Sequence, residues 1–173
     1  MSSYFNREWL MLYHGSTVNV QFIDLSKGKD YKDFGKGFYT TSSKIQAEKF
    51  AKLLARRRKT KGYVSEYKAD KLIEGLSFKE FKTADIEWLD FVVFNRTHAG
   101  KQHPYDIVIG PVADDDTNIV IQAYMNGVYG NPDYPTVKSY AISLLEPENL
   151  KNQIYIGTDR AVSRLTYIGG YVL

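Results

Sequence analysis

The sequence predicts an α+β fold over one domain, residues 1–173, because strand-like and helix-like segments follow one another without a repeat or a linker. Short runs of β-branched and aromatic residues, such as residues 105–112, indicate strands. Capped segments with apolar residues at helical spacing indicate helices. The 14 Tyr and 9 Phe suit half-buried strand faces, although they suit planar ligands equally well.

In the first half, Trp9 to Tyr13 is an apolar run typical of a buried strand, and Phe38 to Thr41 is a second strand after a polar loop. Ser42 or Ser43 can cap the helix that follows, which runs to about residue 59. Its apolar stripe is expected to consist of Ala47, Phe50, Ala51 and Leu54. Gly62 ends this helix, and residues 63–68 alternate like a strand.

In the second half, Thr83 is expected to cap a helix over residues 84–96, with Ile86, Leu89 and Val93 facing inward. A buried strand over 105–112 and a helix over 117–126 follow. Residues 139–150 are ambiguous, since Pro147 interrupts any helix there. The chain is expected to close with a strand over 153–158, a short helix near 159–165 and a strand over 166–173.

Composition excludes several classes of protein. The chain has no cysteine, which excludes disulfides, thiolate nucleophiles and cysteine-bound zinc. No stretch approaches the roughly 20 apolar residues of a membrane span, and the first residues have no apolar signal core, so we expect a cytoplasmic protein without membrane contact. The net charge of +3 permits an anionic partner without requiring one.

Two ordered motifs carry the functional argument. The first is Leu12-Tyr13-His14-Gly15-Ser16, and the second is Gly35-Lys36-Gly37-Phe38-Tyr39-Thr40-Thr41, with Phe50 eleven residues beyond Tyr39. Together they resemble the NAD-binding core of the ADP-ribosyltransferase superfamily, in particular its poly-ADP-ribose-polymerase-like branch. The whole chain is also similar to a bacterial, toxin-like family of that superfamily, through residues 88–91, 95–96 and 105–115 and the strand beginning Gln153-Ile154.

The resemblance implies a split sandwich of two small, mostly antiparallel sheets that flank a cleft for NAD, which is the substrate, with no metal. It implies that His14 orients NAD through the adenosine ribose, that the Gly15 backbone pairs with the nicotinamide carboxamide, and that Tyr39 and Phe50 sandwich the nicotinamide ring. Ser16, Gly37, Phe38 and Arg96 complete the expected cofactor-binding set, although Arg96 is equally consistent with a simple helix-end residue.

The expected catalytic residues are His14, Tyr39 and Gln153. Cleavage of the bond between nicotinamide and ribose passes through an oxocarbenium-like state, which a nearby negative charge stabilises. The superfamily usually places a glutamate where this chain has Gln153, and a Gln amide can orient NAD but supplies no charge. Ala47 also replaces a serine of the polymerase-like branch, so one carboxamide contact is lost.

The resemblance implies mono-ADP-ribosyl transfer onto a protein or nucleic-acid acceptor, by a bacterial toxin or phage-defence effector with an antitoxin partner that covers the cleft. Gln153 favours a different function, a non-catalytic module that binds NAD or ADP-ribose. A third interpretation is a nucleic-acid-binding domain, favoured by the run Arg56-Arg57-Arg58. Hydrolysis of NAD with water as the acceptor is a fourth.

Three further features have simple structural explanations. The Arg56 to Arg58 run can complement the dipole at a helix end, or it can contact phosphates. Asp114 to Asp116 can cap the helix from Thr117, since consecutive residues lack the spacing of a calcium loop. His98 and His103, five residues apart, lack the helical pairing of a zinc site.

Overall fold

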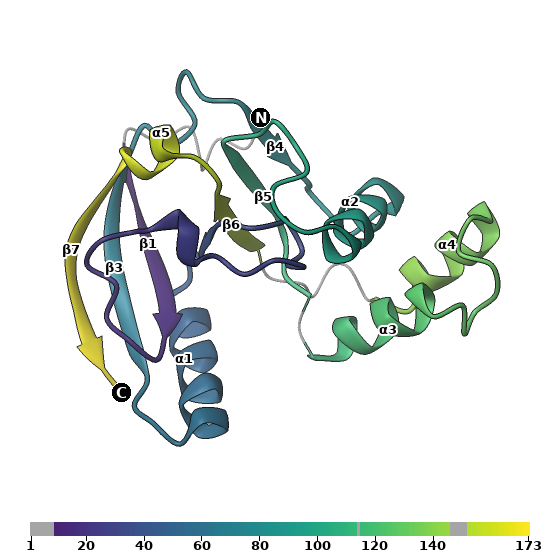
Figure 1. Cartoon of the computed structure of the whole chain (residues 1–173), viewed down its shortest axis with the longest axis horizontal. Coiled ribbons are helices and arrows are strands. Elements are labelled where there is room, and N and C mark those ends of the chain that lie inside the picture. Colours follow the sequence, from purple (N-terminus) through teal and green to yellow (C-terminus); the bar gives the residue numbers. More distant parts are fainter. Residues whose placement is uncertain (1–8, 114, 146–151) are drawn as a thin grey trace.

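A computed structural model describes residues 9–113, 115–145 and 152–173 (Figure 1). The strands are β1 (Trp9–Ser16), β2 (Phe38–Thr40), β3 (Tyr63–Asp70), β4 (Phe78–Glu80), β5 (Ile107–Pro111), β6 (Asn152–Ile156) and β7 (Leu165–Val172). The helices are α1 (Lys44–Arg58), α2 (Ile86–Thr97), α3 (Asp115–Met125), α4 (Pro135–Ser143) and α5 (Asp159–Val162), with a single 3-10 turn, η1 (Leu25–Lys27).

The strands form two small sheets, so the α+β prediction is confirmed. The first sheet has the order β1-β3-β7 and is antiparallel throughout. The second has the order β2-β6-β5-β4 and is mixed, because β4 runs parallel to β5. Figure 1 shows α1 beside the first sheet, α2 beside the second, and α3 with α4 projecting away from both sheets.

The hydrophobic core is divided into layers by the two sheets. Between the sheets, Leu12 of β1 and Tyr67 of β3 meet Ile109 of β5 and Ile154 of β6. The other face of the second sheet packs on α2, α3 and α4, with the fully buried Trp88 among the contacts. A small cluster of buried residues, Ala47, Ala51 and Val64, joins α1 to the first sheet.

In α1 the N-cap agrees with the prediction, but the set of apolar residues that the helix buries does not. The Ser43 hydroxyl accepts the backbone N–H of Gln46, as an N-cap residue does. Ala47 and Ala51 are buried, but Phe50 is 49% exposed, so it does not belong to the buried stripe. The burial of a helix face is decided by the sheet below it, and here only the alanines fit against that sheet.

Other boundaries were wrong for local reasons. The cap of α2 is Asp85, whose carboxylate accepts the Trp88 N–H, instead of Thr83, and Ile86 is consequently exposed at the helix start. Strand β4 was missed because three residues give no periodicity. Helix α4 begins at Pro135, earlier than the ambiguous segment, and Pro147 lies outside the described residues.

Strand β1 also runs further than predicted, through Ser16, because β3 pairs with all eight of its residues.

No helix in the described ranges is long and apolar enough to cross a membrane.

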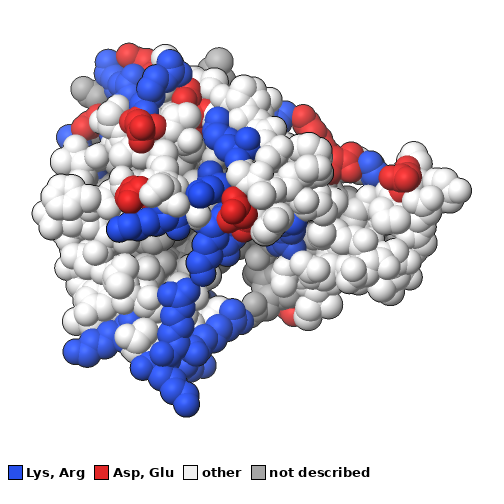
Figure 2. Space-filling model, in the orientation of Figure 1, with Lys and Arg blue, Asp and Glu red and all other residues white. Residues whose placement is uncertain are grey.

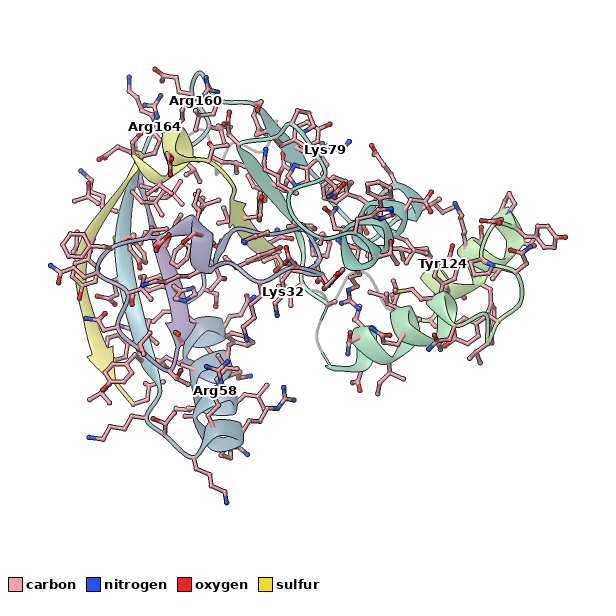
Figure 3. The ribbon with its side chains drawn as sticks, in the orientation of Figure 1. Lys32, Arg58, Lys79, Tyr124, Arg160 and Arg164 are labelled. Carbon is pink, nitrogen blue, oxygen red and sulfur yellow. The ribbon has the colours of Figure 1, made fainter. Side chains whose placement is uncertain are left out.

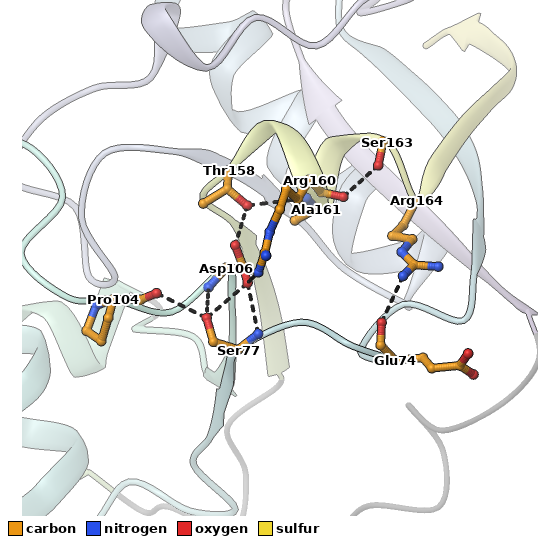
Figure 4. A network of polar contacts seen from close by, with 9 residues as sticks. All are labelled: Glu74, Ser77, Pro104, Asp106, Thr158, Arg160, Ala161, Ser163 and Arg164. Atoms are coloured by element: carbon orange, nitrogen blue, oxygen red, sulfur yellow. Dashed lines mark hydrogen bonds and ion pairs between the residues drawn. The ribbon is translucent and has the colours of Figure 1, made fainter.

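Asp106, a buried carboxylate just before β5, hydrogen-bonds the segment before β4 and the segment around α5 (Figure 4). Its oxygens accept from the Thr158 hydroxyl at 2.6 Å, from Arg160 Nη2 at 2.6 Å and from the Ser77 backbone N–H at 2.8 Å. Burial alone would raise the pKa of Asp106, but these hydrogen bonds outweigh burial and hold the pKa well below its usual range.

We expect Asp106→Asn to lower the free energy of unfolding by about 2–3 kcal/mol at pH 7, because charge-assisted hydrogen bonds are replaced by neutral ones. A depressed carboxylate pKa stabilises the fold fully above the unfolded value near 3.9, and this stabilisation is lost progressively as the pH falls from there through the lower pKa of the folded state. Urea unfolding should therefore show the difference between native and variant chains shrinking from pH 7 to pH 3. The same substitution at exposed Asp159 is the control, and an equal loss there would contradict this role for Asp106.

Candidate functional site

Besides packing face to face, the two sheets are joined by a backbone bridge between Tyr13 of β1 and Thr41, the residue after β2. The Tyr13 N–H donates to the Thr41 carbonyl at 2.8 Å, and the Thr41 N–H donates to the Tyr13 carbonyl at 2.9 Å. On either side of this bridge the strands separate, since β1 continues along β3 and β2 continues along β6. We call this feature the splay point.

Gly15 lies two residues beyond the splay point. Alternate residues of an antiparallel strand direct their backbone groups to the same side, so the Gly15 N–H and C=O, like those of Tyr13, point toward β2. Among the described residues, no loop or turn group hydrogen-bonds them. A Cβ at Gly15 would lie 2.2 Å from the Ala47 carbonyl oxygen, so only glycine allows α1 to pack this closely.

His14 is held at the splay point in one orientation. Its Nδ1 lies 2.7 Å from the Tyr39 carbonyl oxygen, and since a carbonyl only accepts, Nδ1 is the donor. Its ring lies 4.3 Å from that of Phe38, which packs on the core between the sheets. Burial lowers the pKa of His14, and the bond to Tyr39 opposes this shift only in part. The ring is therefore neutral at pH 7, with Nε2 as a hydrogen-bond acceptor.

The segment Gly35-Lys36-Gly37 is a rigid loop. The Tyr39 hydroxyl accepts the Phe34 N–H at 3.0 Å and donates to the Gly35 carbonyl at 2.7 Å, and the Tyr155 hydroxyl donates to the Lys36 carbonyl at 2.8 Å. Gly35 has a φ of 84°, and a Cβ at Gly37 would lie 2.2 Å from the Tyr155 ring.

The Tyr39 hydroxyl is thus committed to the loop and does not act as a proton donor to a substrate. Burial, followed by the charge of Asp33, raises its pKa well above the usual range. Its ring faces α2 with Phe34 and Tyr155, on the side of β2 opposite to Phe38. Phe38 and Tyr39 of β2 were both predicted to contact NAD. In the structure the Phe38 ring packs on His14, and the Tyr39 hydroxyl hydrogen-bonds the glycine loop.

Phe50 lies on the flank of α1 that faces the splay point. Gln46, one turn earlier on the same flank, accepts the Thr41 hydroxyl at 3.1 Å through Oε1. Half of the Phe50 side chain is exposed, and it makes no aromatic contact within the described part of the chain. Phe50 and Tyr39 therefore do not contact each other in the structure, and their predicted sandwich around a nicotinamide ring stays a prediction.

Gln153 faces the same side of the second sheet as Tyr39. Tyr39 pairs with Tyr155, and Gln153 is two residues before Tyr155, so all three side chains share one face. The register also places Gln153 opposite Thr41 and so next to the splay point. Gly15, Phe50 and Gln153 therefore all lie near the splay point, Gly15 on β1, Phe50 on α1 and Gln153 on β6.

The structure adds a residue that sequence reasoning missed, Asp33. Arg96 Nε and Nη2 both lie 2.8 Å from Asp33 Oδ1, while Gln153 Nε2 lies 3.4 Å from Asp33 Oδ2. Arg96 Nη1 also donates to Asn118 Oδ1 at 2.7 Å. The Arg96 and Asp33 side chains are only 10% and 16% exposed, so this ion pair is largely withdrawn from water.

Arg96 was expected either among the cofactor-binding residues or as a simple helix-end residue, and in the structure its charge is matched by Asp33. Asp33 gave no sequence signal, because it is one polar residue in a polar loop.

The remaining predicted residues take simple positions. Ser16 ends β1, paired with Tyr63. Arg56 to Arg58 form the exposed last turn of α1, with Arg58 Nη1 donating to the Thr17 hydroxyl at 3.2 Å. Asp115 and Asp116 lie in the first turn of α3, and residue 114 is outside the described ranges.

Each remaining histidine pairs with a backbone carbonyl, His98 with Phe94 and His103 with Phe34. No group of three or more potential metal ligands occurs within the described residues. A shallow depression lined by Asp24, Leu25 and Thr158 lies beside η1, and none of the predicted NAD-binding residues lines it.

Comparison with known proteins gives one match. No curated protein and no solved structure matches the chain significantly. A model of a protein family matches residues 10–167, from β1 into β7, which spans the splay point, the glycine loop and Gln153. The chain therefore belongs to this family, which is described as a protein of unknown function, DUF3990.

Proposed function

We propose that this protein binds NAD at the splay point and transfers its ADP-ribose group to a macromolecule. The observation that carries the proposal is the pair Gly15 and His14, where backbone groups without a hydrogen-bond partner among the described residues adjoin a neutral imidazole of fixed orientation. A carboxamide needs one donor and one acceptor, and the Gly15 backbone offers both toward β2. The His14 Nε2 can accept from a ribose hydroxyl.

Phe50 supports the same proposal from the other side of the region. An exposed phenylalanine beside the Gly15 edge provides a flat apolar face with negative π charge, which suits a cationic nicotinamide ring. A residue that served only packing would be expected inside, as Ala47 and Ala51 are.

In the proposed reaction, the bond between the nicotinamide nitrogen and ribose C1 breaks, and its electron pair leaves with nicotinamide. A nucleophilic atom of the acceptor forms the new bond to C1 and releases its proton to solvent. Positive charge develops on the ribose in between, so an anion nearby lowers the barrier. Asp33, next to Gln153, is the carboxylate proposed to provide this negative charge. Its Oδ1 is bound by Arg96, whereas its Oδ2 faces Gln153.

The alternative of binding without turnover is favoured by the absence of a carboxylate at position 153 itself. The toxin or phage-defence role and an antitoxin partner stay predictions from the resemblance.

The first test is label transfer from adenylate-labelled NAD in a bacterial lysate, comparing the native chain with Phe50→Ala. Because Phe50 is half exposed, the substitution should change the free energy of unfolding by only about 0.5 kcal/mol, yet reduce transfer at least tenfold. Ile45→Ala, a substitution of another exposed apolar residue of α1, is the control and should retain activity. If NAD binds but neither labelled product nor free nicotinamide forms, the chain is a binding module.

We expect NAD affinity to depend on pH through His14. Its pKa is lowered, so the ring is neutral above pH 6.5 and becomes protonated only as the pH falls further, when Nε2 turns from acceptor into donor. Calorimetric titration should give a constant affinity from pH 7 to 8 and weaker binding toward pH 5. His14→Ala should bind about two- to tenfold more weakly at pH 7.5, as one hydrogen bond is lost, and show no such decline. A native affinity that rises on acidification would contradict the assignment.

A charge exchange tests Asp33. We expect Asp33→Asn to lower kcat at least tenfold with little change in KM, because the charge acts on the transition state. Asp33→Asn combined with Gln153→Glu returns one carboxylate to the same region, next to Arg96, and should recover most of the activity. Thermal unfolding separates this from a purely structural role. Recovery of the Tm without recovery of kcat would show that Asp33 only holds Arg96.

A further inference from the structure

Positive charge is concentrated in one segment of the chain. Residues 27–61 contain 12 Lys and Arg but only 3 Asp and Glu, a net charge of +9. The other 138 residues contain 11 basic and 17 acidic side chains, a net charge of −6. This segment comprises the loop before β2, β2 itself and α1, which are the elements that bound the proposed NAD site. A charge of this size exceeds what one NAD molecule, with two phosphates, requires.

Figure 2 shows Lys and Arg side chains gathered over the free end of α1 and continuing as a band toward the loops above it, beside a notch in the surface. Figure 3 places Lys32 and Arg58 along this band. We call it the basic band, and its members on the loop and on α1 include Lys27, Lys29, Lys32, Lys49, Lys52, Arg56 and Arg58, all exposed.

The helix dipole does not explain the basic band. Lys49, Lys52 and Arg56 follow helical spacing on the face of α1 opposite to buried Ala47 and Ala51. The dipole favours cations only in the last turn, which contains Arg56 but not the two lysines. The loop lysines lie outside any α-helix.

An exposed aromatic residue lies within the basic band. Tyr31 is 59% exposed between Lys29 and Lys32 and has a φ of 60°, a left-handed conformation that bulky residues rarely adopt. A strained, exposed ring among cations serves no packing purpose and suggests a function for the ring. Aromatic rings beside a cationic path bind the unstacked bases of a single strand, whereas a duplex keeps its base faces covered.

We infer that the acceptor is a single-stranded nucleic acid, whose phosphates lie on the basic band and one of whose bases stacks on Tyr31. This inference rests on the proposed function and names its acceptor. The strand would enter beside α1 and present a base, ribose or terminal phosphate oxygen or nitrogen as the nucleophile. That atom bonds to ribose C1, nicotinamide departs with the electron pair, and the nucleophile's proton is released.

The test is fluorescence anisotropy with labelled 20-nucleotide single-stranded RNA, single-stranded DNA and duplex DNA, on the native chain without NAD. Lys49→Gln with Lys52→Gln and Arg56→Gln should weaken single-strand binding at least tenfold. It should also reduce the slope of log K against log salt by about 2, as three phosphate contacts are lost. Tyr31→Ala should weaken binding at least fivefold with little change in that slope. The stronger of the two single strands identifies the acceptor class.

The control is Lys68→Gln with Lys71→Gln and Lys82→Gln, which removes the same charge outside residues 27–61 and should leave binding within about twofold. Equal loss in this control, or duplex binding as tight as single-strand binding, would overturn the inference. The two proposals fail separately. Transfer of label to protease-sensitive products, without oligonucleotide binding, would overturn the nucleic-acid acceptor and keep the transferase. Oligonucleotide binding without NAD turnover would overturn the transferase.

Discussion

The structure depends on the two backbone hydrogen bonds between Tyr13 and Thr41. They are the contact at which an antiparallel sheet and a mixed sheet meet edge to edge, and the strands part from there. A continuous sheet would use the backbone groups of Gly15 for pairing. Because the sheets separate, those groups keep their direction toward β2 without pairing with that strand, and the fold itself leaves an open strand edge here.

His14 maintains this separation. Its ring fills the space beside Phe38, and its Nδ1 uses the Tyr39 carbonyl, a group that a continuous ladder would need for itself. The same bond fixes the tautomer, and burial keeps the ring neutral. One side chain therefore both holds the two strands apart and presents an acceptor, so packing and proposed function cannot be separated at this residue.

Near the splay point, one largely buried ion pair lies close to Gln153, and exposed cations surround it at a greater distance. Close to Gln153, the Asp33 and Arg96 pair is largely withdrawn from water, where electrostatic interactions are strong and directional. Further out, the exposed cations of α1 and of the loop before β2 attract anions over roughly one Debye length, about 8–10 Å at physiological ionic strength. The first arrangement suits one reacting bond, and the second suits the capture of a large anion.

The sequence by itself determined the fold class, most strand positions, a serine cap at residue 42 or 43 and the two glycine motifs, because periodicity, caps and glycine requirements are local properties. It did not determine that Phe50 would be exposed while Ala47 is buried, since the sheet beneath α1 decides which side of the helix fits. It gave no indication of Asp33, whose partners Arg96 and Gln153 are 63 and 120 residues away. Such contacts exist only when the sheets are assembled, so they belong to the tertiary structure alone.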